Sequence, residues 1–159
     1  MDGVTIARAL HVVFVVLWIG GVAFVTTVLL PAVRRLKTPH ERMQLFDQIE
    51  RCFAWQARIS TAVVGLTGFY MLYRFDIWDR FRLAAYWWID AMAAVWVIFT
   101  LMLFIVEPFN LHRWFLGRSE PEPQIAFKRL EWLHRILLII SLITVLGAVV
   151  GSHGLLLFK

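Results

Sequence analysis

Four stretches of this chain are long and apolar enough to cross a lipid bilayer, and this leaves few alternatives for its fold. They occupy residues 4–30, 52–74, 84–108 and 133–157. Each meets the roughly 20 residues that a helix needs to cross a hydrocarbon core about 30 Å thick. Lipid offers backbone groups no hydrogen-bond partners, so each stretch is expected to be a helix. We predict an all-α integral membrane protein, an antiparallel four-helix bundle of up-down-up-down topology.

The composition favours one membrane domain. Hydrophobic residues make up 60% of the 159 positions, and the mean hydropathy is +0.71. The longest polar stretch, 109–132, is expected to be a loop and is too short for a second domain. Residues 1–159 should therefore form a single transmembrane domain. The N-terminal apolar run has no basic region before it, and we interpret it as a retained helix. The one cysteine, Cys52, excludes an intrachain disulfide and a c-type haem attached through CxxCH.

Basic residues are distributed unevenly among the connections, and this predicts an orientation. The net charge is +5. The first and third connections contain ten of the Lys and Arg residues: Arg34, Arg35, Lys37, Arg42, Arg51, Arg113, Arg118, Lys128, Arg129 and Arg135. The middle connection and the termini contain five: Arg8, Arg74, Arg80, Arg82 and Lys159. The positive-inside rule therefore predicts a multi-pass protein of the cell inner membrane, with these two connections cytoplasmic and both termini outside, on the periplasmic side. The bilayer explains the basic balance, and we expect no nucleic-acid partner.

The first connection contains a helix-start signal. Thr38 is a suitable cap, Pro39 suits the first helical position, and Glu41 falls in the first turn. We expect a short interfacial helix over 38–50, or an extension of the second span. His40 is expected to be a solvated loop residue.

Two histidines lie inside apolar spans near opposite ends of the chain. Histidine is costly in hydrocarbon without a partner, so His11 and His153 are candidate functional residues. At about 1.5 Å per residue, they lie roughly 10 Å and roughly 6 Å below the outer surface. Gly68, Asp90 and Gly151 fall at a comparable depth. The four helices should thus contribute one layer of small and polar residues.

This layer suits a b-type haem. Haem iron accepts neutral imidazole as an axial donor, so His11 and His153 are the predicted ligands. Gly68 and Gly151 would make room for the flat macrocycle, although glycines equally permit close backbone approach, and both interpretations remain open. Trp18, seven residues after His11 and on the same helix face, would line the cavity.

Two charged residues complete the predicted site. Arg8, at the outer end of the first span, would face a haem propionate. Asp90 is the candidate catalytic residue, either orienting a ligand imidazole or relaying protons. Plainer alternatives exist: Asp90 could pair with Arg82, and each histidine could form only an interhelical hydrogen bond.

A second polar group lies towards the cytoplasmic side. Arg58 is inside the second span and needs a counter-charge, for which Glu107 and Glu131 lie at a suitable depth. An ion-pair lock near the interface is the favoured interpretation. His112 and His134 could instead hold a second haem, so the number of haems stays open.

Three segments carry a family resemblance. Segment ALHVVFVVLWIGGVAF (9–24) resembles the first helix of the CopD-type copper-resistance membrane family and of the related HemJ-type protoporphyrinogen oxidases. Segments RCFAWQARISTAVVGLTGFYML (51–72) and AAYWWIDAM (84–92) resemble their second and third helices. The resemblance covers roughly residues 5–105.

The resemblance implies a membrane-embedded bundle of four or five spans. It implies copper uptake if the chain is CopD-like, and a b-type haem with protoporphyrinogen oxidation if it is HemJ-like. His11 matches the first-helix histidine of both families. The chain has no counterpart of the HemJ-type third-helix lysine and carries Asp90 there instead.

The leading functional hypothesis is a b-type haem membrane protein with a redox role. It could be an oxidoreductase, and its redox partner could be a quinone, a porphyrinogen or a partner electron carrier. The alternative is a copper-binding or copper-transporting protein using His11, His153 and either Asp90 or Met92, because imidazole and thioether suit copper. A second alternative is a structural membrane subunit, and a homo-oligomer is possible in each case. HExxH, GxSxG and Walker motifs are absent from the sequence.

Overall fold

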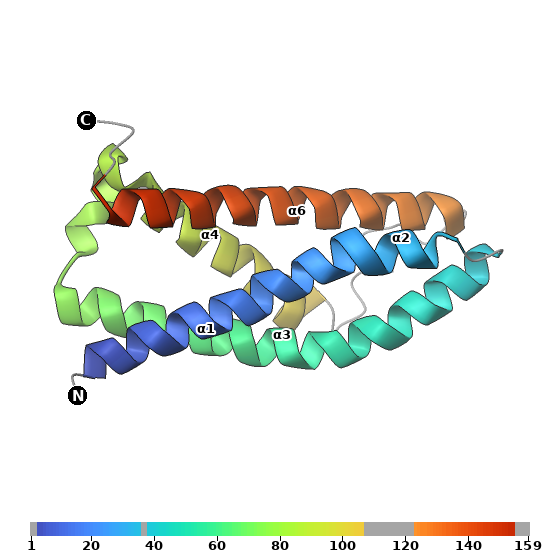
Figure 1. Ribbon diagram of the computed structural model, residues 1–159, viewed down its shortest axis with the longest axis horizontal. Coiled ribbons are helices and arrows are strands. Elements are labelled where there is room, and N and C mark those ends of the chain that lie inside the picture. Colours follow the sequence, from blue (N-terminus) through green and yellow to red (C-terminus); the bar gives the residue numbers. More distant parts are fainter. Residues whose placement is uncertain (1–2, 36–37, 107–122, 155–159) are drawn as a thin grey trace.

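The computed structural model describes residues 3–35, 38–106 and 123–154, and this part of the chain is helical without strands (Figure 1). Its helices are α1 (Gly3–Phe24), α2 (Leu30–Val33), α3 (Pro39–Phe75), α4 (Trp87–Leu101) and α6 (Pro123–Ser152). Two π-helical turns, Val25–Leu29 and Met102–Val106, extend α1 and α4, and 3-10 turns at Trp78–Arg82 and Ala84–Tyr86 precede α4. The prediction of an all-α protein is confirmed for the described residues.

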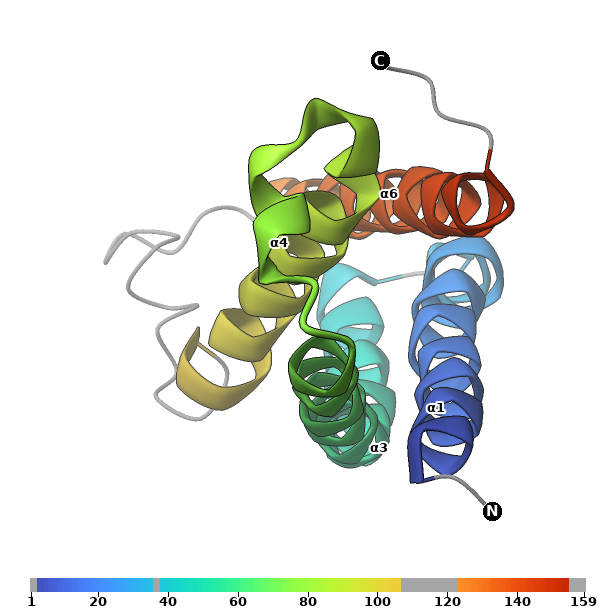
Figure 2. The same ribbon diagram turned by 90° about the vertical axis from the view of Figure 1, so that its left-hand side faces the viewer.

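Successive helices run in alternating directions. In Figure 1, α1 and α2 run from left to right, α3 returns, α4 runs back behind them and α6 returns again. The described chain therefore begins and ends at the same end of the molecule. The most extensive contact is between α1 and α3, and the next is between α4 and α6. Figure 2, turned by 90°, shows α1 beside α3 and α6 crossing over them.

Three helical stretches are long and apolar enough to cross a membrane: Gly3–Val33, Ala84–Val106 and Phe127–Ser152. They correspond to the first, third and fourth predicted spans. The second predicted span, 52–74, lies within α3, which is not among the three. Arg58 and Arg74 bracket an apolar run, 59–73, that covers only about 22 Å at about 1.5 Å per residue. This run also includes the buried Ser60 and Thr61, which lower its hydropathy.

The first stretch runs without a break from Gly3 to Val33, because the π-helical turn Val25–Leu29 joins α1 to α2 as one continuous helical stretch. Pro31 has no N–H to donate to the carbonyl of Thr27, and the π-helical turn Val25–Leu29 comes shortly before it. Thr26 and Thr27 donate to the carbonyls of Val22 and Ala23, each at 2.7 Å.

The start of α3 follows the predicted capping signal. The Thr38 hydroxyl accepts from the Glu41 N–H at 3.3 Å, and the Glu41 carboxylate accepts from the Thr38 N–H at 3.2 Å. The expected extension of the second span is therefore present, as one helix from Pro39 to Phe75. The loop assignment of His40 is wrong, because His40 lies in the first turn of this helix.

The limits of α6 differ from the predicted 133–157. The helix starts at Pro123, ten residues before the predicted start, because Phe127 and Leu130 face the core while Lys128 and Arg129 stay exposed. An amphipathic first turn of this kind does not register as an apolar run. The helix ends at Ser152, and Gly154 follows with a φ of 88°. The end of the fourth predicted span, 155–157, lies outside the described residues.

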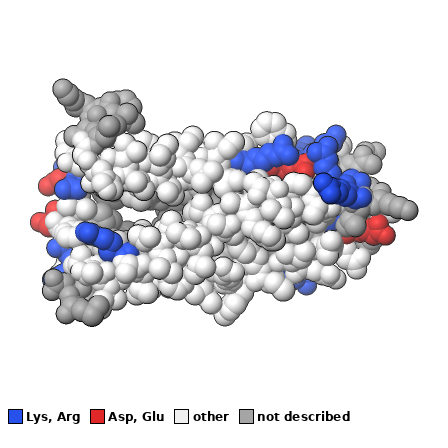
Figure 3. Space-filling view, viewed as in Figure 1, with Lys and Arg blue, Asp and Glu red and all other residues white. Residues whose placement is uncertain are grey.

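Charged side chains gather at the two ends of the molecule, and the face in Figure 3 is uncharged between them. At the end that carries α2 and the first turns of α3 and α6, exposed basic residues are dense: Arg34, Arg35, Arg51, Lys128, Arg129 and Arg135. The core inside the uncharged band is built around Trp18, Val64, Val95, Phe99 and Leu137, from all four long helices.

Candidate functional site

The imidazole of His11 lies in the interface between α1 and α3. Its Nδ1 is 3.1 Å from the carbonyl oxygen of Val64 and 3.0 Å from the hydroxyl oxygen of Thr67. That hydroxyl donates its proton to the carbonyl of Val63 at 2.6 Å, so it accepts from the imidazole. A carbonyl is always an acceptor. Two acceptors around Nδ1 place a proton on Nδ1, and in a neutral ring this leaves a lone pair on Nε2.

Gly68 allows the imidazole to lie this close to α3. A Cβ atom at position 68 would be 3.3 Å from Cε1 of His11, which is tighter than ordinary van der Waals contact. The sequence left two uses for this glycine, close approach and room for a flat cofactor. In the structure the space above Gly68 is taken by the ring of His11 itself. The sequence analysis expected these two residues at a comparable depth, and the structure places them in contact.

His153 occupies a different environment. It follows the last residue of α6, its side chain is exposed, and its Nδ1 is 2.8 Å from the carbonyl oxygen of Val149 in its own helix. Figures 1 and 2 show the C-terminal end of α6 well separated from the N-terminal part of α1. The structure therefore anchors His11 against α3 and His153 against α6, and it does not bring the two imidazoles together.

Trp18 and Arg8 also have contacts of their own. The Trp18 ring is buried in the core and packs edge-on against Phe99, with the ring centres 4.9 Å apart. It therefore fills the core where the sequence suggested a cavity wall. The guanidinium of Arg8 is exposed and lies 5.7 Å from the centre of the Phe75 ring, a cation–π contact at the end where the chain begins.

Gly151 and Asp90 are not part of the His11 surroundings. The position that a Cβ of Gly151 would take is filled by the ring of Trp88, and the same holds for Gly147 and the ring of Trp87. These glycines thus seat tryptophan rings from the start of α4 against α6. Asp90 is exposed in the first turn of α4. Of the predicted layer, the structure brings together His11 and Gly68.

The second polar group, which the sequence analysis placed towards the cytoplasmic side, is seen in part. The Nε of Arg58 donates to the carbonyl of Leu103 at 3.0 Å, and this carbonyl belongs to the last described turn of its helix. Glu131 is buried, and the Nδ1 of His134 is 3.0 Å from the carbonyl oxygen of Leu130. Glu107 and His112 lie outside the described residues.

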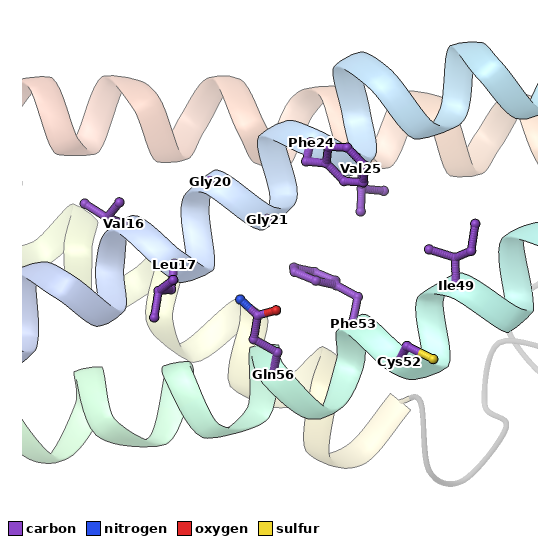
Figure 4. Close-up of a pocket in the computed structure, with 10 residues that line it drawn as sticks. All are labelled: Val16, Leu17, Gly20, Gly21, Phe24, Val25, Ile49, Cys52, Phe53 and Gln56. Atoms are coloured by element: carbon purple, nitrogen blue, oxygen red, sulfur yellow. The ribbon is translucent and has the colours of Figure 1, made fainter.

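A groove between α1 and α3 was not predicted. It has a volume of about 560 Å³ and a mostly apolar wall, with the amide of Gln56 among its lining groups (Figure 4). Its lining residues come from α1 with its π-helical turn, and from α3: Val16, Leu17, Gly20, Gly21, Phe24, Val25, Ile49, Cys52, Phe53 and Gln56. The Phe53 ring covers Gly21, whereas a Cβ at Gly20 would meet nothing within 4 Å. The Gly20–Gly21 pair was the signal in the sequence for a notch on this face.

The described residues contain no group of three or more His, Cys, Asp or Glu side chains that could hold a metal ion. A metal held by this part of the chain would therefore depend on one or two protein ligands, as haem iron does. Comparisons of the chain with protein-family models, with curated proteins and with solved structures found no match.

Proposed function

We propose that this protein is a multi-pass membrane protein that holds a b-type haem through His11 and takes part in electron transfer. The observation that carries the proposal is the state of the His11 ring, with Nδ1 bound to Val64 and Thr67 and Nε2 free. Histidines that ligate metals almost always donate their other ring N–H to a carbonyl or a similar acceptor, which fixes the ring and raises its basicity.

The donor chemistry fits a haem iron with one protein ligand better than a bare metal ion. Neutral imidazole is a common axial ligand of haem, and the tetrapyrrole supplies the equatorial nitrogens that this chain does not offer. Bound haem would supply one-electron chemistry at its iron. The chain would hold the ring of His11 in place through Thr67 and offer the exposed Arg8 to a propionate.

The position of His153 does not support it as a second haem ligand beside His11. We therefore propose His11 as the ligand on which haem binding depends. A porphyrinogen, a lipid-soluble quinone and a partner electron carrier all remain candidate redox partners, and the apolar groove between α1 and α3 suits the quinone best.

We further propose that all four long helices lie in the inner membrane as an antiparallel bundle, including α3. The hydroxyl of Thr67 would be tolerated there because it meets His11 of α1. The packing of α3 against α4 includes a bond from the Nε1 of Trp96 to the backbone carbonyl of Thr61 at 2.9 Å. The basic end of the molecule would then be cytoplasmic and both termini periplasmic.

The proposal is tested by the absorption spectrum of the detergent-purified protein expressed with a supply of haem. We expect a Soret band in the wild type and in His153→Ala, and its loss in His11→Ala. Equal loss in both variants would restore the two-histidine site expected from the sequence. Copper in place of iron in the purified protein would favour the CopD-type alternative, and colourless, metal-free protein would favour a structural subunit.

A further inference from the structure

Two buried polar groups in the middle of the core lack a hydrogen-bond partner. They are the indole N–H of Trp18 and the hydroxyl of Thr61, and neither has a partner among the residues that the structure describes. Trp18 is 3% exposed and Thr61 is 0% exposed. Buried polar groups are nearly always paired with protein or with ordered water, and in lipid no outside solvent can replace the missing partner.

The orientation of the Thr61 hydroxyl is unusual for this protein. Other core hydroxyls donate to the carbonyl four residues earlier in their own helix, as those of Thr26, Thr100 and Thr144 do at 2.7–2.8 Å. The Thr61 hydroxyl forms no such bond. A threonine in a helix has two accessible rotamers, of which one lets the hydroxyl bond to its own backbone and the other does not.

Trp18 and Thr61 lie in the same region of the core. The Trp18 ring packs against Phe99, and the carbonyl of Thr61 accepts from Trp96, one turn earlier in α4. The pairing of α1 with α3 agrees in direction, because His11 meets Val64 and the two antiparallel helices run from these residues towards Trp18 and Thr61. The indole nitrogen and the hydroxyl oxygen are nevertheless too far apart to bond directly, since neither is a partner of the other.

We infer that a buried water molecule occupies the core between Trp18 and Thr61. It accepts from the indole N–H, which can only donate, and bonds to the Thr61 hydroxyl, which can do both. Polar groups that face each other beyond direct bonding distance are commonly bridged in this way, and buried waters occur about once per 27 residues in globular proteins. This site is independent of the proposed haem.

The test is solution NMR of protein carrying ¹⁵N-labelled tryptophan in lipid nanodiscs. The Trp18 indole resonance is assigned by its absence in Trp18→Phe. We expect magnetisation transfer from water to this indole proton, although it lies in the middle of an apolar span. Transfer should be lost in Thr61→Val, which keeps the side-chain shape and the carbonyl bond to Trp96, and should persist in Thr61→Ser.

Thr100→Val is the matched control, because the Thr100 hydroxyl already donates to the carbonyl of Trp96. Its Trp18 resonance should keep the wild-type water transfer. Absence of water transfer in the wild-type protein would overturn the inference. If Thr61→Val still shifted the Trp18 resonance, a direct hydrogen bond between the two residues would explain that shift. Unchanged transfer in Thr61→Val would overturn it as well. The wild-type measurement decides the question if Thr61→Val fails to fold.

Discussion

His11 and Thr67 are joined across the interface of α1 and α3, with 3.0 Å between Nδ1 of the imidazole and Oγ1 of the hydroxyl. The hydroxyl is itself oriented by its bond to the carbonyl of Val63. This short relay determines which nitrogen of His11 carries the proton and which way the ring faces. Removing the hydroxyl should therefore alter the ligand without removing it.

Thr67→Val should weaken haem binding by about 10- to 100-fold, the usual effect of losing an outer partner of a metal-ligating histidine. Thr67→Ser should retain the wild-type affinity because it keeps the hydroxyl. Haem titration of the apoprotein, followed at the Soret band, measures both. Wild-type affinity in Thr67→Val would show that the hydroxyl does not support the ligand.

Gly68→Val should destabilise the protein by about 1–3 kcal/mol, because the added side chain would collide with the imidazole of His11. Gly20→Ala is the matched control, since a Cβ there meets nothing within 4 Å. Thermal unfolding in detergent, followed by circular dichroism, should show a lower Tm for the first variant and an unchanged Tm for the second. A similar Tm for both would mean that α1 and α3 do not approach closely at Gly68.

Gly151→Ala should also lower the stability, by about 1–3 kcal/mol, because its Cβ would overlap the ring of Trp88. Replacing Trp88 by Leu in the same chain should remove most of this penalty, giving a clear coupling energy in the double-mutant cycle. The haem content per folded protein should not change. If Gly151→Ala instead lost haem at unchanged stability, Gly151 would line the cofactor as the sequence first suggested.

Thr38→Ala should weaken the first turn of α3 by about 0.5–2 kcal/mol, because both bonds of the capping box depend on Thr38. Thr38→Ser should restore it. Hydrogen exchange of peptides from the start of α3 should accelerate in the alanine variant and not in the serine variant. Equal exchange in all three proteins would argue against the cap.

Labelling of the single cysteine, Cys52, can show on which side of the membrane the basic end of the protein lies. Cys52 is exposed and lies between Arg51 and the buried part of α3, at the basic end of the molecule. A membrane-impermeant maleimide should label it in inverted vesicles and not in intact cells with a permeabilised outer membrane. A Cys52→Ser, Asp79→Cys protein, with the thiol at the opposite end, should show the reverse. Labelling of Cys52 from outside would contradict the proposed orientation.

The helical class and three apolar spans followed from sequence because hydrophobic length alone determines them. The capping residues of α3 were also readable, since capping is a local interaction. The second predicted span was less readable from sequence, because its apolar run is short and contains polar residues. Thr61 and Thr67 lower its hydropathy, and only the packed structure shows that Thr61 is buried and that Thr67 meets His11.

The candidate site was predictable to one residue pair. His11 and Gly68 meet because α1 and α3 pack along their length, and a depth estimate can detect such a match. Depth gives no information on which way a side chain points around its helix. His153 and Gly151 were therefore expected at the depth of His11, but they do not face it. His153 lies beyond the end of α6, and Gly151 accommodates the ring of Trp88.

The most direct test of the central claim is the Soret absorbance per mole of purified protein, measured for wild type and for His11→Gly with and without added imidazole. We predict a stoichiometric band in the wild type, its loss in the variant, and its return with free imidazole, which would occupy the position of the missing ring. A full band in His11→Gly without imidazole, or no band in haem-supplied wild type, would contradict the account.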